Sequence, residues 1–289
     1  MQGSPKKYQK RVSYFQLCNG LFLLVLILVM IIPLINVWAV SFSSGISSME
    51  PGVKLWPADF SVSGYQRVWQ TLELWRPFFN NVLVTVIGTA AHVLLASMAG
   101  YVLIHPKLVG RKIIVSMIMI TMMVPAEAIM IPLYIVNKEL GLLDTLASLV
   151  ISGLISGFSI LLMRNYFLSV PYSLAESAQM DGASDFKIFR KVYMPMSVPG
   201  LATIMLFEFV SRWNQFTPAL LYINSPEKYT LQLALMSLIV PDDATSSGDF
   251  FANNVQMAGI MIAMIPLLVI YPFVQKYFIR GINLGATKE

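Results

Sequence analysis

The chain has 289 residues, of which 56% are hydrophobic and 12% are charged. The charged fraction is about half that of an ordinary soluble domain, so the composition excludes that class and predicts an all-α polytopic membrane protein. A single cysteine, Cys18, excludes an internal disulfide, and the two histidines form no cluster at metal-ligand spacing.

Six apolar stretches are long enough to cross a bilayer, which takes about 20 helical residues. They cover residues 17–40, 80–104, 113–136, 145–163, 201–223 and 255–277. An even number of spans predicts that both termini lie on one side. The first stretch follows a basic segment and lacks a small-residue cleavage site, so we interpret it as a retained helix rather than a signal peptide.

Basic residues are unevenly divided between the segments outside these stretches. Fourteen lysines and arginines fall on the side of the termini and five on the other side. This asymmetry predicts cytoplasmic termini in a bacterial inner membrane. The formal net charge of +5 then reflects topology and a lipid partner, not nucleic-acid binding.

Glu127, Glu208 and Arg212 lie inside predicted spans, where a charged side chain is costly and therefore a functional candidate. Glu208 and Arg212 are four residues apart, the spacing of an ion pair on one helix face, although they could instead line a polar cavity and gate the substrate. Glu127 follows Pro125, whose ring frees a backbone carbonyl and favours a locally unwound, water-exposed site. We expect His92 to be a packed, hydrogen-bonded residue.

Residues 171–199 are a charged loop between the fourth and fifth stretches. Each of its charged side chains would cost about 2.5 to 3.5 kcal/mol at the centre of a bilayer, so the loop must lie in water. Its pattern predicts two short helices with Phe186, Phe189 and Tyr193 on one face of the second. The boundary signals are a Ser173–Glu176 capping box, an Asp181–Gly182 stop, a Ser184 N-cap and ends at Pro195 and Pro199.

Two segments on the opposite side, residues 41–79 and 224–254, are long enough to contact a partner. They contain several aromatic residues and acids, which suit either a docking face or an interfacial belt and a flexible connector, and both interpretations stay open. The chain has no phosphate-binding loop, no nucleophile elbow and no HExxH motif. An enzyme is therefore disfavoured, and if ATP drives the protein, another chain binds it.

The charged loop resembles the signature of the inner-membrane subunits of binding-protein-dependent ABC importers. That signature is E-A-A, three residues, G, nine residues, then I-x-L-P. The loop keeps this spacing with Glu176, Ser177, Ala178, Gly182 and the segment 192–195. Serine for alanine, valine for isoleucine and methionine for leucine are conservative departures.

Two further stretches resemble the carbohydrate branch of this family, in the subunit similar to the shorter membrane subunit of the maltose transporter. Arg212, Trp213 and Asn214 begin a stretch like W-N-x-F-x-x-P-L, and the tail resembles a G-x-x-x-G-A-x-K ending. The tail and sixth span are similar to the branch that handles alginate-type oligomers. The resemblance covers roughly residue 77 to the end.

The resemblance implies a type I ABC importer transmembrane domain with six helices. It divides the chain into residues 1–76, with the first helix and an outer loop, residues 77–279, the transmembrane domain, and the cytoplasmic tail 280–289. It implies that the ATPase-coupling helix contains Glu176, Ser177, Ala178, Asp181 and Gly182, and that the tail meets the ATPase through Gly285, Ala286 and Lys288. The candidate pathway or gating residues are Glu127, Glu208, Arg212, Trp213 and Asn214.

The function implied is saccharide import, with an oligosaccharide, and an acidic one, as the expected cargo. The implied partners are a second homologous permease, an ATPase dimer that binds ATP and Mg, and an extracytoplasmic solute-binding protein; this chain itself needs no cofactor. The alternatives are an ion-coupled secondary transporter, with a carboxylate such as Glu127 or Glu208 as the proton site, and an ABC permease for a non-sugar solute.

Overall fold

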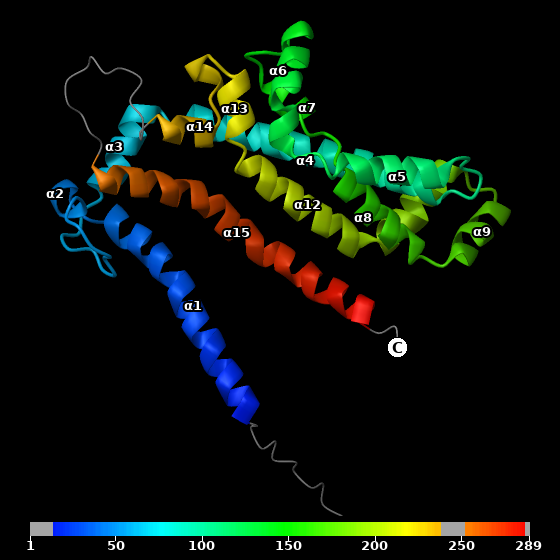
Figure 1. The fold of residues 1–289 in the computed structure, drawn as a ribbon, viewed down its shortest axis with the longest axis horizontal. Helices are drawn as coiled ribbons and strands as arrows, with labels where there is room; N and C mark the ends of the chain where they lie inside the picture. Colours follow the sequence, from blue (N-terminus) through cyan, green and yellow to red (C-terminus); the bar gives the residue numbers. More distant parts are fainter. Residues whose placement is uncertain (1–13, 238–251, 287–289) are drawn as a thin grey trace, which may run out of the picture. The chain divides into compact units, whose positions relative to one another are not determined.

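A computed structural model describes residues 14–237 and 252–286 (Figure 1). Over these residues the chain is helical, and its β-structure is limited to one isolated bridge between Ser43 and Phe60. The described residues group into two compact units, 14–70 with 252–261, and 71–237 with 262–286. The long helix α15 (Asn253–Ala286) contributes to both.

The smaller unit contains α1 (Tyr14–Ser41), α2 (Gly45–Ser48) and most of α3 (Ser63–Leu72). Nearly all of α1 is apolar and exposed until Ala39, as expected of a helix whose surroundings are lipid. The loop that follows α1 is held at the start of α15, where the Asn254 side chain donates to the Ser43 carbonyl and to the Ser63 hydroxyl. These contacts order part of the predicted outer segment 41–79.

The larger unit is built around α4 (Trp75–Ile104), which packs along α8 (Gly157–Leu168) and α12 (Val198–Trp213) (Figure 1). Small residues permit the close approach. A Cβ atom on Gly100 would lie 2.9 Å from the backbone nitrogen of Arg164, so only glycine lets α4 lie this near to α8.

Three of the predicted spans are interrupted rather than continuous. The third comprises α5 (Arg111–Thr121), then η1 (Ala126–Ile129) and α6 (Met130–Glu139), with a bend of 92°. The predicted span 145–163 divides into α7 (Leu146–Ile151) and α8, and the span 201–223 divides into α12 and α13 (Thr217–Tyr222). The physical reasons are local, since Pro125 and Pro218 lack an amide hydrogen and Gly153 has a φ of +90°.

Three helices among the described residues are individually long and apolar enough to cross a membrane, namely α1, α4 and the described apolar part of α15, and up to five spans result if each bent pair is one. This multi-pass, all-helical architecture agrees with the six-helix transmembrane domain predicted above.

Buried apolar side chains form two clusters along α4. The Phe167 cluster lies toward the end of α4 that carries Tyr101 and contains residues Val93, Ala96, Leu103, Ile160, Met163, Phe167, Val170, Ala175, Ile188, Phe189, Tyr193 and Ile204. The Tyr222 cluster lies toward the end that carries Asn80 and contains residues Val84, Leu149, Ala219, Tyr222, Ile223 and Leu233. The interrupted spans contribute to both, because α8 and α12 carry residues of the Phe167 cluster while α7 and α13 carry residues of the Tyr222 cluster.

Candidate functional site

The first helix of the charged loop, α9 (Tyr172–Met180), presents an exposed face. Ala175 is buried in the Phe167 cluster, whereas Glu176, Ser177 and Asp181 are exposed. The predicted stop is confirmed, because α9 ends at Met180 and Gly182 adopts a φ of +75°. The predicted capping box is wrong: Pro171 is the N-cap, which places Ser173 inside the first turn.

The second part of the loop forms the second predicted helix. Ser184 caps α10 (Asp185–Ile188) as expected, its hydroxyl accepting from the Lys187 amide. The helix then continues through the π-helical turn η2 (Phe189–Tyr193) and α11 (Met194–Met196). The predicted end is confirmed, because this helix ends at Met196, between Pro195 and Pro199, and the chain then turns by 82° into α12.

The Phe189 and Tyr193 rings are buried against α4 and α8. Tyr101 lies 5.2 Å from Phe189 and 5.1 Å from Tyr193 between ring centroids, and Phe167 lies 5.7 Å from Tyr193. Phe186 was predicted to share this face but is exposed, although its ring centroid lies 6.2 Å from that of Phe189. We call the four packed rings the aromatic joint.

A recess of 390 Å³ lies beside α9, between the loop after α4 and the start of α10. It is lined by His105, Lys107, Gln179 and Asp185 among others. The His105 ring nitrogen lies 3.8 Å from the Asp185 carboxylate. The exposed face of α9 therefore adjoins a polar hollow rather than a flat surface.

The ion pair predicted between Glu208 and Arg212 is present within α12. Arg212 Nε donates to Glu208 Oε1 at 2.6 Å, and the arginine is only 4% exposed. Its remaining nitrogens donate to the carbonyls of Leu149 and Val150, at 3.0 and 3.2 Å, and of Gly153, at 3.0 Å. The guanidinium thus joins α12 to the interrupted fourth span.

His92 on α4 completes this polar cluster and is a packed residue, as predicted. Its Nδ1 lies 3.2 Å from the Gly153 carbonyl and 3.4 Å from Glu208 Oε1, and its Nε2 lies 2.8 Å from the Ser159 hydroxyl. Because Nδ1 faces only acceptors, we assign the proton of a neutral ring to Nδ1, with Nε2 accepting from Ser159.

The other candidate pathway residues lie in different surroundings. Trp213 is buried and its Nε1 donates to the Ala263 carbonyl at 3.0 Å, while its ring stacks on Phe209. Asn214 is exposed at the end of α12, and Glu127 is exposed in η1. The structure therefore unites Glu208 and Arg212 but not Glu127 with them.

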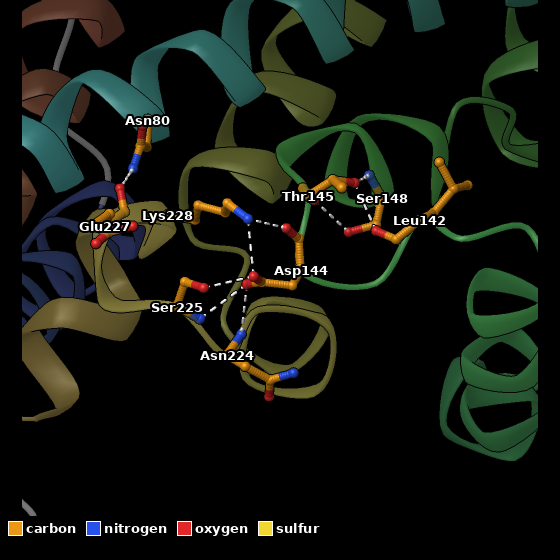
Figure 2. Close-up of polar contacts among 9 residues, drawn as sticks. All are labelled: Asn80, Leu142, Asp144, Thr145, Ser148, Asn224, Ser225, Glu227 and Lys228. Carbon is orange, nitrogen blue, oxygen red and sulfur yellow. Dashed lines mark hydrogen bonds and ion pairs between the residues drawn. The ribbon is translucent and has the colours of Figure 1, made fainter.

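A further polar cluster, around Asp144, was not singled out from the sequence. Figure 2 shows the Asp144 carboxylate facing Asn224, Ser225 and Lys228. Oδ1 accepts from the amides of Asn224 at 3.1 Å and Ser225 at 2.9 Å, and Oδ2 accepts from the Ser225 hydroxyl at 2.6 Å and from Lys228 Nζ at 2.9 Å. These bonds, first those from Ser225 and then that from Lys228, hold the pKa of Asp144 well below its usual range.

The same loop is also held by α4. The Asn80 side-chain amide donates to the Glu227 carbonyl at 2.9 Å (Figure 2). It also donates to the Tyr229 carbonyl at 3.0 Å. The described beginning of the predicted outer loop 224–254 is therefore fixed at two points, through η3 (Pro226–Lys228) and before α14 (Leu231–Met236). No local signal could identify Asp144, because its partners follow about 80 residues later in the chain.

The predicted tail residues lie close to or beyond the last described residue, Ala286. Gly285 and Ala286 fall in the last turn of α15, while Lys288 lies outside the described residues. No group of three or more His, Cys, Asp or Glu residues within 14–237 and 252–286 is arranged to hold a metal ion.

Comparison with protein families gives one match that covers most of the chain. Residues 92–284 match the family described as "Binding-protein-dependent transport system inner membrane component". Two relatives come from Bacillus subtilis (strain 168). The chain is 35% identical to the polygalacturonan/rhamnogalacturonan transport system permease protein YtcP, over 92% of this chain and 96% of the relative. It is 28% identical to the arabinooligosaccharides transport system permease protein AraQ, over 98% and 99%.

A solved structure has the same fold over nearly all of the chain. It belongs to a bacterial ABC transporter involved in the import of the acidic polysaccharide alginate, and the match has a TM-score of 0.83 with 34% sequence identity. It covers 95% of this chain and 100% of the other.

Proposed function

The chain belongs to the family of binding-protein-dependent transport system inner membrane components, and we propose that it is the permease subunit that forms half of a saccharide pathway in an ATP-driven importer. Members of this family are transport subunits rather than enzymes. The observation that carries the proposal is the charged loop, which presents the exposed α9 at the end of a packed transmembrane unit.

The partners follow from the surfaces of the chain. A second, homologous permease would complete the pathway, and an ATPase dimer that binds ATP and Mg would receive α9 through Glu176 and its exposed neighbours. A solute-binding protein would meet the opposite side, where residues 224–230 are held by Asp144 and Asn80. In this proposal the complex lies in the inner membrane with both termini of the chain in the cytoplasm, which the distribution of basic residues supports.

We propose an acidic oligosaccharide as the cargo. The support is that two of the similar proteins carry names with uronic-acid polysaccharides, polygalacturonan/rhamnogalacturonan and alginate. A pathway for such a solute has to accommodate hydroxyl and carboxylate groups. The exposed polar side chains of Glu127 and Asn214 are candidates for its lining.

The geometry suggests how closure of the ATPase subunits would move the transmembrane helices. Movement of α9 would pass to α4 and α8 through the aromatic joint, and to α12 through the 82° corner that follows Met196. A ligand shifts a two-state equilibrium only by its differential affinity for the states, so ATP must favour the state in which the ATPases are closed on α9.

The proposal is tested by reconstituting the chain with its permease, ATPase and binding-protein partners in liposomes. We expect oligogalacturonide uptake that requires ATP and the binding protein, with ATPase activity stimulated by the loaded binding protein. Uptake by this chain alone, driven by a pH gradient, would refute the importer and support a secondary transporter. Stimulation by a non-sugar solute but by no saccharide would refute the cargo.

A further inference from the structure

The interruption of the fourth span leaves polar backbone groups inside a transmembrane unit. α7 ends at Ile151 and α8 begins at Gly157, so the carbonyls of the last turn of α7 cannot all be used within the helix. In a membrane such groups must be satisfied by neighbouring protein, because an unpaired group there costs several kcal/mol. Donors for these carbonyls must therefore come from other parts of the protein.

Arg212 supplies these hydrogen bonds from another helix. Its two terminal nitrogens donate to three carbonyls, those of Leu149, Val150 and Gly153, while its Nε pairs with Glu208. Only a guanidinium can do this, because it has five donors in a planar fork and a lysine ammonium has three around a single point.

Space for the guanidinium is provided by a glycine on α4. A Cβ atom on Gly88 would lie 2.4 Å from Arg212 Nη1 and 2.6 Å from its Cζ. Gly88 has an ordinary helical backbone, so steric room is the reason for glycine here. One turn later on α4, His92 contacts the Gly153 carbonyl, inside the interruption, and the Ser159 hydroxyl, in the first turn of α8.

We propose that Arg212 is a positioning residue for transport. It acts as a splint, by which we mean that its hydrogen bonds hold the interrupted fourth span in one conformation, so that α4, α7, α8 and the end of α12 move as one body. Arg212, Glu208 and His92 form a polar cluster between the two apolar clusters. Through Arg212 this polar cluster connects the helices of the Phe167 cluster to α7 and hence to the Tyr222 cluster. Movement that begins at the charged loop then reaches Asp144 and residues 224–230 without being absorbed at residues 152–156. This inference rests on the proposed function, because transport is one of its readouts.

Two variants test the splint in different ways. Arg212→Lys retains the positive charge but cannot reach all three carbonyls, and Gly88→Ala retains every charge but displaces the guanidinium. We expect each to lower uptake per ATP hydrolysed by about 3- to 30-fold, the range of substitutions along a coupling network. The double variant should be no worse than the more affected single variant, because both remove the same contact.

The matched controls are Gly20→Ala and Arg76→Lys. A Cβ on Gly20 would meet nothing within 4 Å, and Arg76 is exposed. Both should behave as the wild type. Uptake is normalised to the assembled complex, so that a loss of folding is separated from a loss of coupling.

A second readout does not depend on transport. Spin labels at the exposed positions Ile151 and Leu168, on either side of the interruption, should give one narrow distance distribution in the wild type and a broader one in both variants. An unchanged distribution, additive losses in the double variant, or normal coupling in Arg212→Lys would overturn the inference. If Arg212→Lys does not assemble into the complex, the distance distribution and the coupling of Gly88→Ala test the inference by the same criteria. A wild-type complex without ATP-driven uptake would instead refute the proposed function.

Discussion

At one end of α4, Tyr101 packs its ring against Phe189 and Tyr193, whereas at the other end Asn80 donates two hydrogen bonds to the loop after α13. Ring packing is non-directional and depends on area, while the bonds of the Asp144 cluster depend on the position of each atom. The aromatic joint is therefore suited to transmit force from a docked partner, and the Asp144 cluster is suited to hold a loop in one conformation.

The largest effect is expected from breaking the aromatic joint. Phe167 is almost fully buried and contacts Tyr101, Phe189 and Tyr193. Phe167→Ala should destabilise the protein by about 3 to 5 kcal/mol, the usual cost of removing a buried phenylalanine side chain. Thermal unfolding of the purified chain measures it, with the exposed Phe186→Ala as the matched control. Equal losses in the two variants would contradict the difference in packing.

A smaller effect on stability, but a large one on coupling, is expected at Gly182. Its φ of +75° is strained for any β-branched residue, although a Cβ there would meet nothing within 4 Å. Gly182→Val should lower uptake by about 5- to 30-fold, because about 1 to 2 kcal/mol of left-handed strain is relieved by moving α9. Gly182→Asn should retain most activity, since asparagine tolerates this conformation. If the valine variant shows normal substrate-stimulated ATPase activity, α9 is not the coupling helix.

The Asp144 cluster should give an intermediate loss. Asp144→Ala removes four hydrogen bonds to the loop at once, and we expect uptake to fall by about 2- to 10-fold through weaker docking of the binding protein. Lys228→Met removes only the charged donor and should cost less. The affinity of the complex for the binding protein measures both. If the variants lost affinity for the ATPase subunits and kept their affinity for the binding protein, the Asp144 cluster would not lie on the side that meets the binding protein.

The smallest effect is that of pH on the same cluster. The folded pKa of Asp144 is lowered from its ordinary value of 3.8 by the Ser225 and Lys228 bonds. The stabilisation is then fully present above about pH 4 and is lost as the pH falls through the lowered pKa. The difference in thermal stability between wild type and Asp144→Ala should stay constant from pH 8 to pH 5 and shrink only in stronger acid. A difference that disappears near neutral pH would exclude Asp144 as its source.

The features predicted correctly from the sequence depend on residues that are near one another in the chain. Gly182 and Ser184 mark a helix end and a helix start within three residues, and Glu208 and Arg212 are one turn apart. The capping box failed because Pro171 moved the helix start, and Phe186 is exposed although it lies only three residues before the buried Phe189.

The features that were missed depend on contacts between distant segments. Asp144 bonds to residues about 80 positions later, and Arg212 bonds to carbonyls about 60 positions earlier. Backbone carbonyls carry no sequence signal, so the role of the arginine beyond its ion pair could not be inferred. The interruption near Gly153 was likewise hidden in an apolar stretch that looked long enough to span.

The pairing of Glu208 with Arg212 inside one helix also bears on how the chain enters the membrane. A lone arginine or glutamate at the centre of a bilayer costs roughly 2.5 to 3.5 kcal/mol on insertion scales. Because the two charges are one turn apart, α12 can pass into lipid as a nearly neutral segment before α4 and α7 are in place. Biogenesis of this helix therefore depends on its own glutamate, and only afterwards does the arginine need the glycine of α4.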